Sequence, residues 1–61
     1  MDIKEIIKMY GKTDYYEMMT GRIFKMSQAT YDQYTDTTFI PVDQDGDYCG
    51  DIKIKGNIFD E

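Results

Sequence analysis

The clearest pattern of apolar and polar positions lies in the second half of the chain. Residues 37–42 form a β-branched and aromatic run, and residues 51–55 alternate between polar and apolar side chains with a period of two. An Asp/Gly-rich segment, residues 43–50, separates the two runs. Two strand signals on either side of an Asp-Gly turn signal predict a β-hairpin. Because side chains alternate along a strand, Ile52 and Ile54 are expected together on the buried face.

The start of the chain follows the spacing of a helix instead. Apolar side chains recur at i, i+3, i+4 and i+7, which places them on one stripe of an α-helix. These side chains belong to Ile3, Ile6, Ile7 and Tyr10. The pattern predicts a helix over residues 2–10, ended by Gly11 at a position where glycine commonly ends helices. So short a helix is not stable alone in water, so its stripe must pack against another element.

Residues 14–26 carry two conflicting signals. Asp14, with Glu17 three positions later, is compatible with a capping box that opens a helical turn. Aromatic and β-branched residues on either side of a Thr-Gly pair are typical of a hairpin. The aromatic density favours the hairpin, with strands over about residues 15–19 and 22–26.

A second short helix is expected between the two hairpins, because Ser27 is a natural N-cap and residues 28–34 have room for two helical turns behind it. These elements predict an α+β fold: a short N-terminal helix packed on a small antiparallel sheet of two hairpins, with the second short helix between them. With no linker and no internal repeat, residues 1–61 are expected to form a single small domain. The residues expected in its core are Ile6, Ile7, Ile23, Phe24, Ile52 and Ile54.

Composition limits what can support so small a domain. A chain of 61 residues buries only about 60% of its unfolded surface, so its net stability is small. With no histidine and one cysteine, Cys49, the chain cannot form an internal disulfide or a structural zinc site. Support from a partner protein or a second copy is therefore expected.

The chain shows no targeting or membrane-spanning pattern. Its first five residues lack the basic and apolar regions of a signal peptide. No apolar run approaches the roughly 20 residues that span a bilayer. We expect a soluble, cytoplasmic protein, and this compartment suits an unpaired cysteine.

Negative charge is concentrated in the middle of the chain. The net charge is −5, and residues 27–52 contain six aspartates but no lysine or arginine. Dense like charges repel one another and weaken a fold that has little stability to spare. A solvated face is the common explanation for such a segment. The alternative is a surface that meets a basic partner.

No catalytic, cofactor or metal motif in the chain is complete. Asp43, Asp45 and Asp47 match the first ligands of a calcium loop, but Tyr48 replaces its glycine and Ile54 its bidentate glutamate. The single cysteine is flanked by aspartates, which disfavour a reactive thiolate. Without histidine, the Ser-His-Asp arrangement is not possible. We therefore expect a non-enzymatic protein without a cofactor or metal.

In size and charge, the chain is similar to the small acidic inhibitors that phages and other mobile elements deploy against host nucleic-acid enzymes. That resemblance implies a basic host protein as the partner, because aspartates offer its lysines and arginines the charge that nucleic acid would offer. Direct binding to nucleic acid is disfavoured by the same charge, and no membrane is implied. Tyrosines within the acidic segment would add contact area. The predicted partner-binding residues are Tyr31, Asp32, Tyr34, Asp36, Asp43, Asp45, Asp47 and Tyr48.

The sequence is also compatible with a function of another class, that of a small homo-oligomeric structural or accessory protein. In that hypothesis, copies of the chain pair through their exposed sheet edges, for example as a homodimer.

Overall fold

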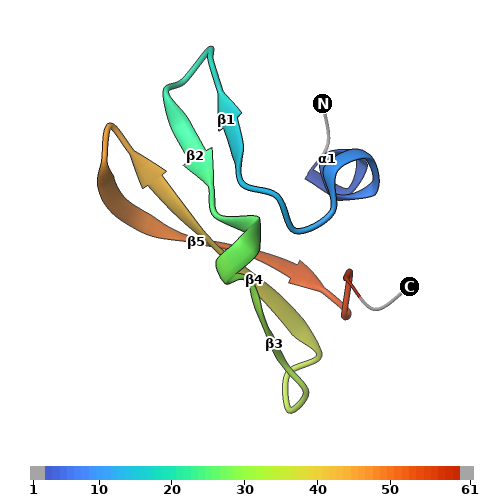
Figure 1. Cartoon of the computed structure of the whole chain (residues 1–61). Coiled ribbons are helices and arrows are strands. Elements are labelled where there is room, and N and C mark those ends of the chain that lie inside the picture. Colours follow the sequence, from blue (N-terminus) through green and yellow to red (C-terminus); the bar gives the residue numbers. More distant parts are fainter. Residues whose placement is uncertain (1–2, 60–61) are drawn as a thin grey trace.

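The structure, a computed structural model, describes residues 3–59 and shows one N-terminal helix and a five-stranded antiparallel sheet (Figure 1). The α+β class predicted from the sequence is therefore confirmed. Within residues 3–59, no helix has the length and apolar character needed to cross a membrane. In chain order, the elements are α1 (Ile3–Tyr10), β1 (Tyr15–Glu17), β2 (Arg22–Phe24), the 3₁₀ turn η1 (Met26–Gln28), β3 (Thr30–Asp32), β4 (Thr37–Gln44) and β5 (Asp47–Lys55).

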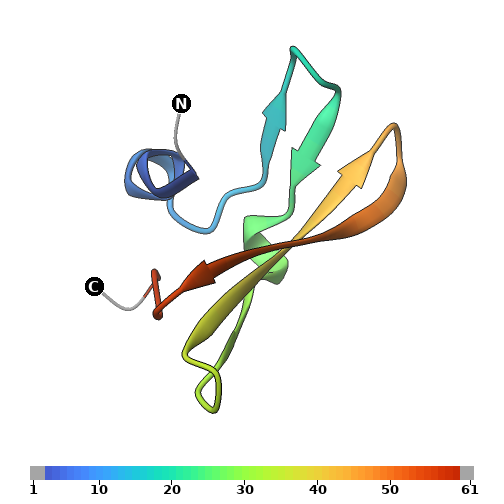
Figure 2. The ribbon, with the colours of Figure 1, turned by 180° about the vertical axis from the view of Figure 1, so that it is seen from behind.

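Strand β4 is the centre of the sheet. One of its edges pairs with β5 along the whole strand, while the other edge pairs with β3 over residues 37–39 and with β2 over residues 42–44. The turn η1 joins β2 to β3 and lies beside the middle of β4 (Figures 1 and 2). Strand β1 pairs only with β2, so it forms one edge of the sheet, and β5 forms the opposite edge.

A proline is accommodated in this central strand. Pro41 lacks an N–H, and its sequence position suggested a sheet edge or a bulge. It lies instead opposite the break between β2 and β3, where its carbonyl accepts a hydrogen bond from the Lys25 N–H at 2.8 Å. Because the N and C=O of one strand residue face the same side, the missing N–H also faces this break. The hydrogen bonds between β4 and β5 therefore lose no N–H donor at Pro41.

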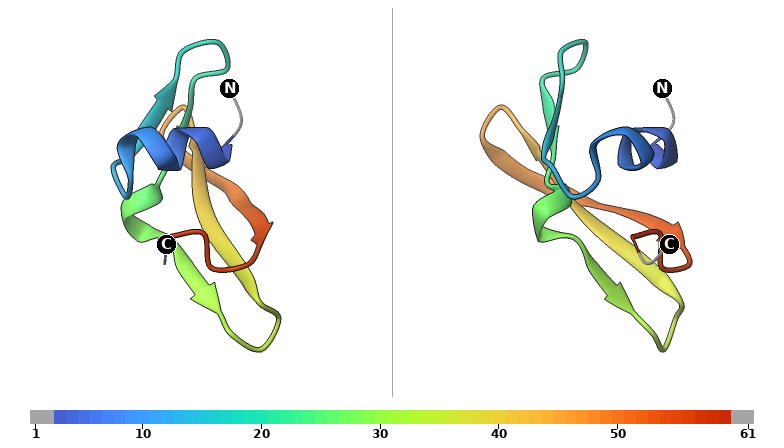
Figure 3. Two further views of the ribbon diagram at one scale, coloured as in Figure 1. Left: turned by 90° about the vertical axis from the view of Figure 1, so that its right-hand side faces the viewer. Right: turned by 45° about the vertical axis from the view of Figure 1, so that its right-hand side comes forward.

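The core lies between α1 and one face of the sheet (Figure 3). Thr38, Ile40 and Val42 alternate toward this face along β4. The buried apolar cluster consists of Ile6, Ile7, Phe24, Met26, Ile40 and Val42. Three residues expected in the core are only half-buried: Ile23, Ile52 and Ile54. Ile23 follows the opposite alternation, and the other two belong to the edge strand β5, which a neighbouring strand covers on one side only.

The prediction of a second helix is wrong. Only the three residues of η1 are helical in this region, and residues 30–32 form strand β3. Ser27 does not cap a helix, since its hydroxyl and its N–H both donate to Asp14 Oδ1, at 2.7 and 3.1 Å. The β-branched and aromatic Thr30 and Tyr31 gain more from pairing with β4 than from an isolated helical turn. A single five-stranded sheet thus replaces two hairpins around a helix.

The ambiguous segment forms strands β1 and β2, which are shorter than expected. They pair antiparallel, with Tyr15 opposite Phe24 and their rings stacked at 6.1 Å. The loop between them is held by Glu17, which accepts hydrogen bonds from the Thr20 hydroxyl and, at 2.9 Å, from Arg22 Nη2. Glu17 therefore closes a hairpin loop and does not take part in a capping box.

Candidate functional site

The eight predicted partner-binding residues lie at opposite ends of β4. Four belong to the hairpin turn between β3 and β4: Tyr31, Asp32, Tyr34 and Asp36. The other four surround the turn between β4 and β5: Asp43, Asp45, Asp47 and Tyr48. At about 3.3 Å per residue, the length of β4 separates these two turns by about 23 Å. The fold therefore brings the residues together in two groups and not in one continuous patch (Figure 1).

The carboxylates of the β3–β4 turn form hydrogen bonds within the fold. Asp36 Oδ1 accepts a hydrogen bond from the Tyr31 hydroxyl at 2.6 Å, and Asp36 Oδ2 lies 4.0 Å from Lys55 Nζ. Asp32 Oδ1 accepts the N–H of Tyr34 at 2.9 Å. The side chain of Tyr34 itself is 92% exposed. Both acidic side chains of this turn thus help to hold its shape.

The β4–β5 turn is held by its backbone instead. Asp45 and Gly46 have φ angles of 51° and 88°, as the type I′ turn of a two-residue hairpin requires. Gln44 and Asp47 face each other across this turn. The Gln44 side chain also donates to the Thr20 carbonyl at 2.6 Å, which ties this turn to the β1–β2 loop. No carboxylate is needed to close the hairpin.

Four aspartates around the β4–β5 turn are here called the acidic tip. The acidic tip consists of Asp43, Asp45, Asp47 and Asp51. Among residues 3–59, none of the four forms a salt bridge, whereas Asp14, Glu17 and Asp36 each do. Arg22 lies close in register, opposite Gln44, but its guanidinium is bonded to Glu17. The acidic tip therefore keeps its negative charge unneutralised.

Hydrogen bonds shift the pKa of two carboxyls outside the acidic tip. Bonds from the Ser27 hydroxyl and N–H hold the pKa of Asp14 below its ordinary value of 3.8. Bonds from Thr20 and Arg22 similarly lower the pKa of Glu17 from 4.5. In both cases the donors stabilise the ionised form. These carboxylates act within the fold and are poor candidates for binding a partner.

The acidic tip adjoins a row of aromatic and apolar side chains on the sheet face opposite α1. Register pairs place Tyr16 opposite Ile23, Ile23 opposite Asp43, and Asp43 opposite Tyr48, and side chains of directly paired residues share a face. Tyr16 is 57% exposed and Tyr48 is 64% exposed. We call these four residues the tip row. Tyr16 was not predicted as an interface residue, and Ile23 was expected in the core, although alternation along the strands places both on the face opposite the core.

A β-bulge fixes the position of Tyr48. The register between β4 and β5 shifts at Val42 and Asp43, and Gly50 has a φ of 122°. Next to this bulge, the Tyr48 hydroxyl donates to Asp51 Oδ1 at 2.9 Å. The bond to a carboxylate raises the pKa of Tyr48 above 10.0, because it stabilises the protonated hydroxyl. The ring is therefore exposed but held in one place.

Chemical groups for catalysis are sparse in this region. Within the described residues, no three His, Cys, Asp or Glu side chains are arranged to hold a metal ion. Cys49, next to Tyr48, is an exposed free thiol. What the acidic tip and the tip row offer together is negative charge beside exposed aromatic area.

Comparisons with known proteins give no functional assignment. No protein-family model, no curated protein and no solved structure matches the chain. Function has therefore to be inferred from the charges and the exposed side chains of the fold itself.

Proposed function

We propose that this chain is a non-enzymatic protein-interaction module whose acidic tip binds a basic surface of a partner protein. The observation that carries the proposal is the lack of ion pairs at all four aspartates of the acidic tip within residues 3–59. Their mutual repulsion weakens a small fold, and a cationic partner would relieve it. The β4–β5 turn does not need these charges, because its backbone closes the hairpin.

The tip row supplies the apolar part of the proposed interface. Interfaces gain most of their binding energy from a few aromatic or arginine anchors, with charges setting orientation and association rate. On one face of the sheet, the tip row runs from Tyr16 through Ile23 and Asp43 to Tyr48. The bond from Tyr48 to Asp51 orders its ring before binding. Less side-chain entropy is then lost when the complex forms.

The narrower form of the proposal is nucleic-acid mimicry. A surface that binds nucleic acid is lined by lysine and arginine side chains, and the phosphates that it binds are anionic. Asp45 and Asp47, two residues apart around a tight turn, present carboxylates to such a surface from a narrow hairpin. The partner would then be a host nucleic-acid enzyme, as it is for the small acidic inhibitors of phages and other mobile elements.

The experiment compares two charge-matched variants. A partner is first recovered from host lysate with the tagged chain and identified by mass spectrometry, and binding is then measured by surface plasmon resonance at several salt concentrations. Asp45→Asn/Asp47→Asn removes two charges from the acidic tip and preserves an Asn-Gly turn, which type I′ hairpins favour. Asp32→Asn/Asp36→Asn removes two charges from the other end of β4.

We expect the acidic-tip variant to associate at least tenfold more slowly at low salt, and its matched control to change about twofold or less, because steering depends on charge close to the interface. The difference should shrink as salt rises and screening shortens to about 8 Å. Tyr48→Ala should act mainly on the dissociation rate. Equal losses in both double variants would show an effect of net charge alone. Unchanged rates in both would make the acidic tip a solvated surface.

One observation favours the alternative, a homo-oligomer that pairs through sheet edges. In the part of the chain that the structure describes, the outer edge of β5 has no partner strand over its nine residues. Lys53, Lys55 and the bulge at Gly50 are features that oppose edge pairing, however. Analytical ultracentrifugation separates the two proposals. A concentration-dependent dimer with no basic partner in the lysate would favour the alternative.

A further inference from the structure

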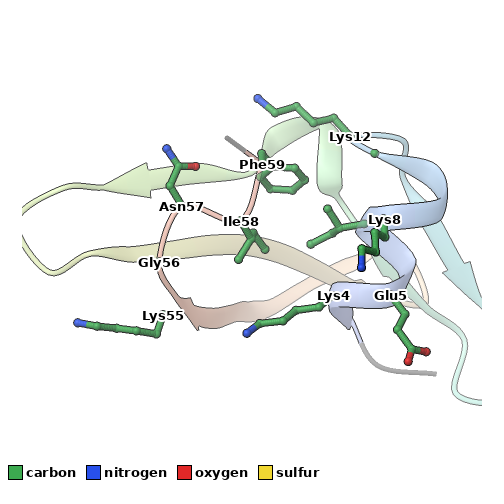
Figure 4. A pocket seen from close by; sticks show the side chains of 11 residues that line it. Lys4, Glu5, Lys8, Lys12, Lys55, Gly56, Asn57, Ile58 and Phe59 are labelled. Carbon is green, nitrogen blue, oxygen red and sulfur yellow. The ribbon is translucent and has the colours of Figure 1, made fainter. Parts of the chain in front are cut away.

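A hollow of about 790 Å³ lies between α1 and the segment that follows β5 (Figure 4). Side chains of α1 and of the turn after it form one wall, and residues 55–59 form the other. It opens at the end of β5 opposite the acidic tip, so it is a separate feature of the surface. Pockets of roughly 300–1,000 Å³ are typical of small-molecule sites.

The rim of this hollow is basic, in a chain of net charge −5. Four lysines and one glutamate line it: Lys4, Lys8, Lys12, Lys55 and Glu5. Lys4 and Lys8 are four residues apart on α1, which puts them on one side of the helix. Lys12 lies in the turn after α1, beyond Gly11, whose φ is 65°. Figure 4 shows the side chains of these three lysines on the side of the C-terminal segment, while Glu5 points away from it. The hollow therefore concentrates positive charge.

The described residues leave the charge of two of these lysines largely unneutralised. Lys8 has no ion pair within residues 3–59, and Lys55 reaches Asp36 only at 4.0 Å, outside the hollow. The ammonium of Lys12 lies 5.3 Å from the centroid of the Phe59 ring. An anion beside Lys8 would supply the countercharge that the described residues lack.

The floor of the hollow is apolar. Ile7 is buried beneath it, and Ile58 and Phe59 are half-buried along the opposite wall. In Figure 4, Ile58 and the Phe59 ring lie between the lysines of α1 and the backbone at Gly56. A purely ionic ligand such as phosphate would leave this apolar area unused. The combination of cationic rim and apolar floor instead suits a ligand with two chemically different ends.

We propose that this hollow binds a small molecule with an anionic head and an apolar body, of the kind represented by a medium-chain carboxylate. The head lies beside Lys8, and the body lies on Ile58 and Phe59. Burial of the body gives most of the affinity, and the lysines select the charge. This site is independent of the proposed protein interaction, because a basic partner is repelled by its rim.

The test uses decanoate as the probe, below its micelle concentration, with acetate and decanol as the two single-feature controls. Isothermal titration calorimetry gives the affinities, and amide chemical shifts locate the site. We expect decanoate to bind at least tenfold more tightly than acetate or decanol. The largest shift changes should fall on the amides of Gly11, Gly56 and Ile58, which belong to the two walls.

Single lysine variants provide the matched comparison. Lys8→Gln should weaken decanoate binding at least fivefold, and circular dichroism should show an intact helix, because glutamine is a good helix former. Lys53→Gln removes the same charge from β5 outside the hollow and should change the affinity less than twofold. Equal affinity for acetate and decanoate, equal losses in Lys8→Gln and Lys53→Gln, or shift changes confined to other residues would each overturn the proposal.

Discussion

The two hairpin turns at the ends of β4 are alike in sequence but differ in how they are held. Each is rich in aspartate, and each contains an aspartate with a φ of 51°, Asp36 in one and Asp45 in the other. In the β3–β4 turn, the Asp36 carboxylate accepts the Tyr31 hydroxyl and lies near Lys55. In the β4–β5 turn, the Asp45-Gly46 backbone closes the hairpin and its carboxylates have no ion pair within residues 3–59.

This difference shows that acidic density alone does not identify an interaction surface. A carboxylate that already accepts internal hydrogen bonds would lose them on meeting a partner, so little binding energy would remain. A carboxylate that repels its neighbours without compensation gains from the same encounter. The internal bonds of the β3–β4 turn assign its aspartates to stability. Within residues 3–59, Asp43, Asp45 and Asp47 of the acidic tip accept no such bond and are available for binding, whereas Asp51 accepts the Tyr48 hydroxyl.

The largest expected effect is on the strand that carries both turns. Ile40, at the middle of β4, is 0% exposed, so Ile40→Ala should lower the free energy of unfolding by about 2–5 kcal/mol. Ile52 faces it from β5 but is only half-buried, so Ile52→Ala should cost clearly less. Urea denaturation followed by circular dichroism measures both. Equal losses would mean that β5 is as well covered as β4, contrary to its position at the sheet edge.

Local patterns predicted the parts of the fold that local chemistry decides. The sequence predicted the helix from the apolar stripe that includes Ile6 and Ile7. It also predicted the β4–β5 turn from the Asp-Gly signal, which lies at residues 45–46. Strand β3 was not predicted, because Thr30–Asp32 form a strand by pairing with one end of β4, while β2 pairs with the other end. Strand propensity depends strongly on such tertiary pairing.

The sequence predicted which residues are candidates for partner binding, but not how the fold arranges them. Six of the eight are exposed, and Asp32 and Asp43 are half-buried. Which of them lie together depends on the length of β4, about 23 Å. Tyr16 lies in the tip row because of the register of three strand pairs. The basic hollow was not predicted from the sequence, although the spacing of Lys4 and Lys8 at i and i+4 places both on one side of the predicted helix.

A second prediction tests the two turns directly through their stability. Asp36→Ala removes the acceptor of the Tyr31 bond and puts alanine at a positive φ, so it should cost about 1–2 kcal/mol in urea denaturation. In Asp36→Asn, asparagine tolerates the positive φ and keeps an oxygen acceptor. This variant should therefore retain most of the stability that Asp36→Ala loses. Asp47→Ala at the acidic tip should stay within about 0.5 kcal/mol of the wild type. A loss at Asp47 as large as that at Asp36 would contradict the distinction between the turns.

The smallest expected effect concerns one tyrosine–aspartate bond at each end of β4. The Tyr31 hydroxyl donates to Asp36, and the Tyr48 hydroxyl donates to Asp51. Each bond to a carboxylate raises the tyrosine pKa above its ordinary 10.0. Ultraviolet absorbance of tyrosinate should therefore show two late ionisation steps. Tyr31→Phe and Tyr48→Phe should each remove one of them, and the control Tyr34→Phe should leave both.

The two bonds should nevertheless differ in their effect on stability. A tyrosine whose pKa is raised on folding contributes stability that is complete below about pH 10, the value of the unfolded chain, and is lost as pH rises through the folded pKa. Tyr31→Phe should lower the urea midpoint at pH 7, because the Asp36 bond helps to close a turn that Gly56 also joins through the Asp36 carbonyl. That deficit should disappear above the folded pKa. Tyr48→Phe should lower the midpoint at pH 7 by less than Tyr31→Phe, since the backbone closes its hairpin, and its smaller deficit should also disappear above the folded pKa. A larger deficit for Tyr48→Phe than for Tyr31→Phe would reverse the roles assigned to the two turns.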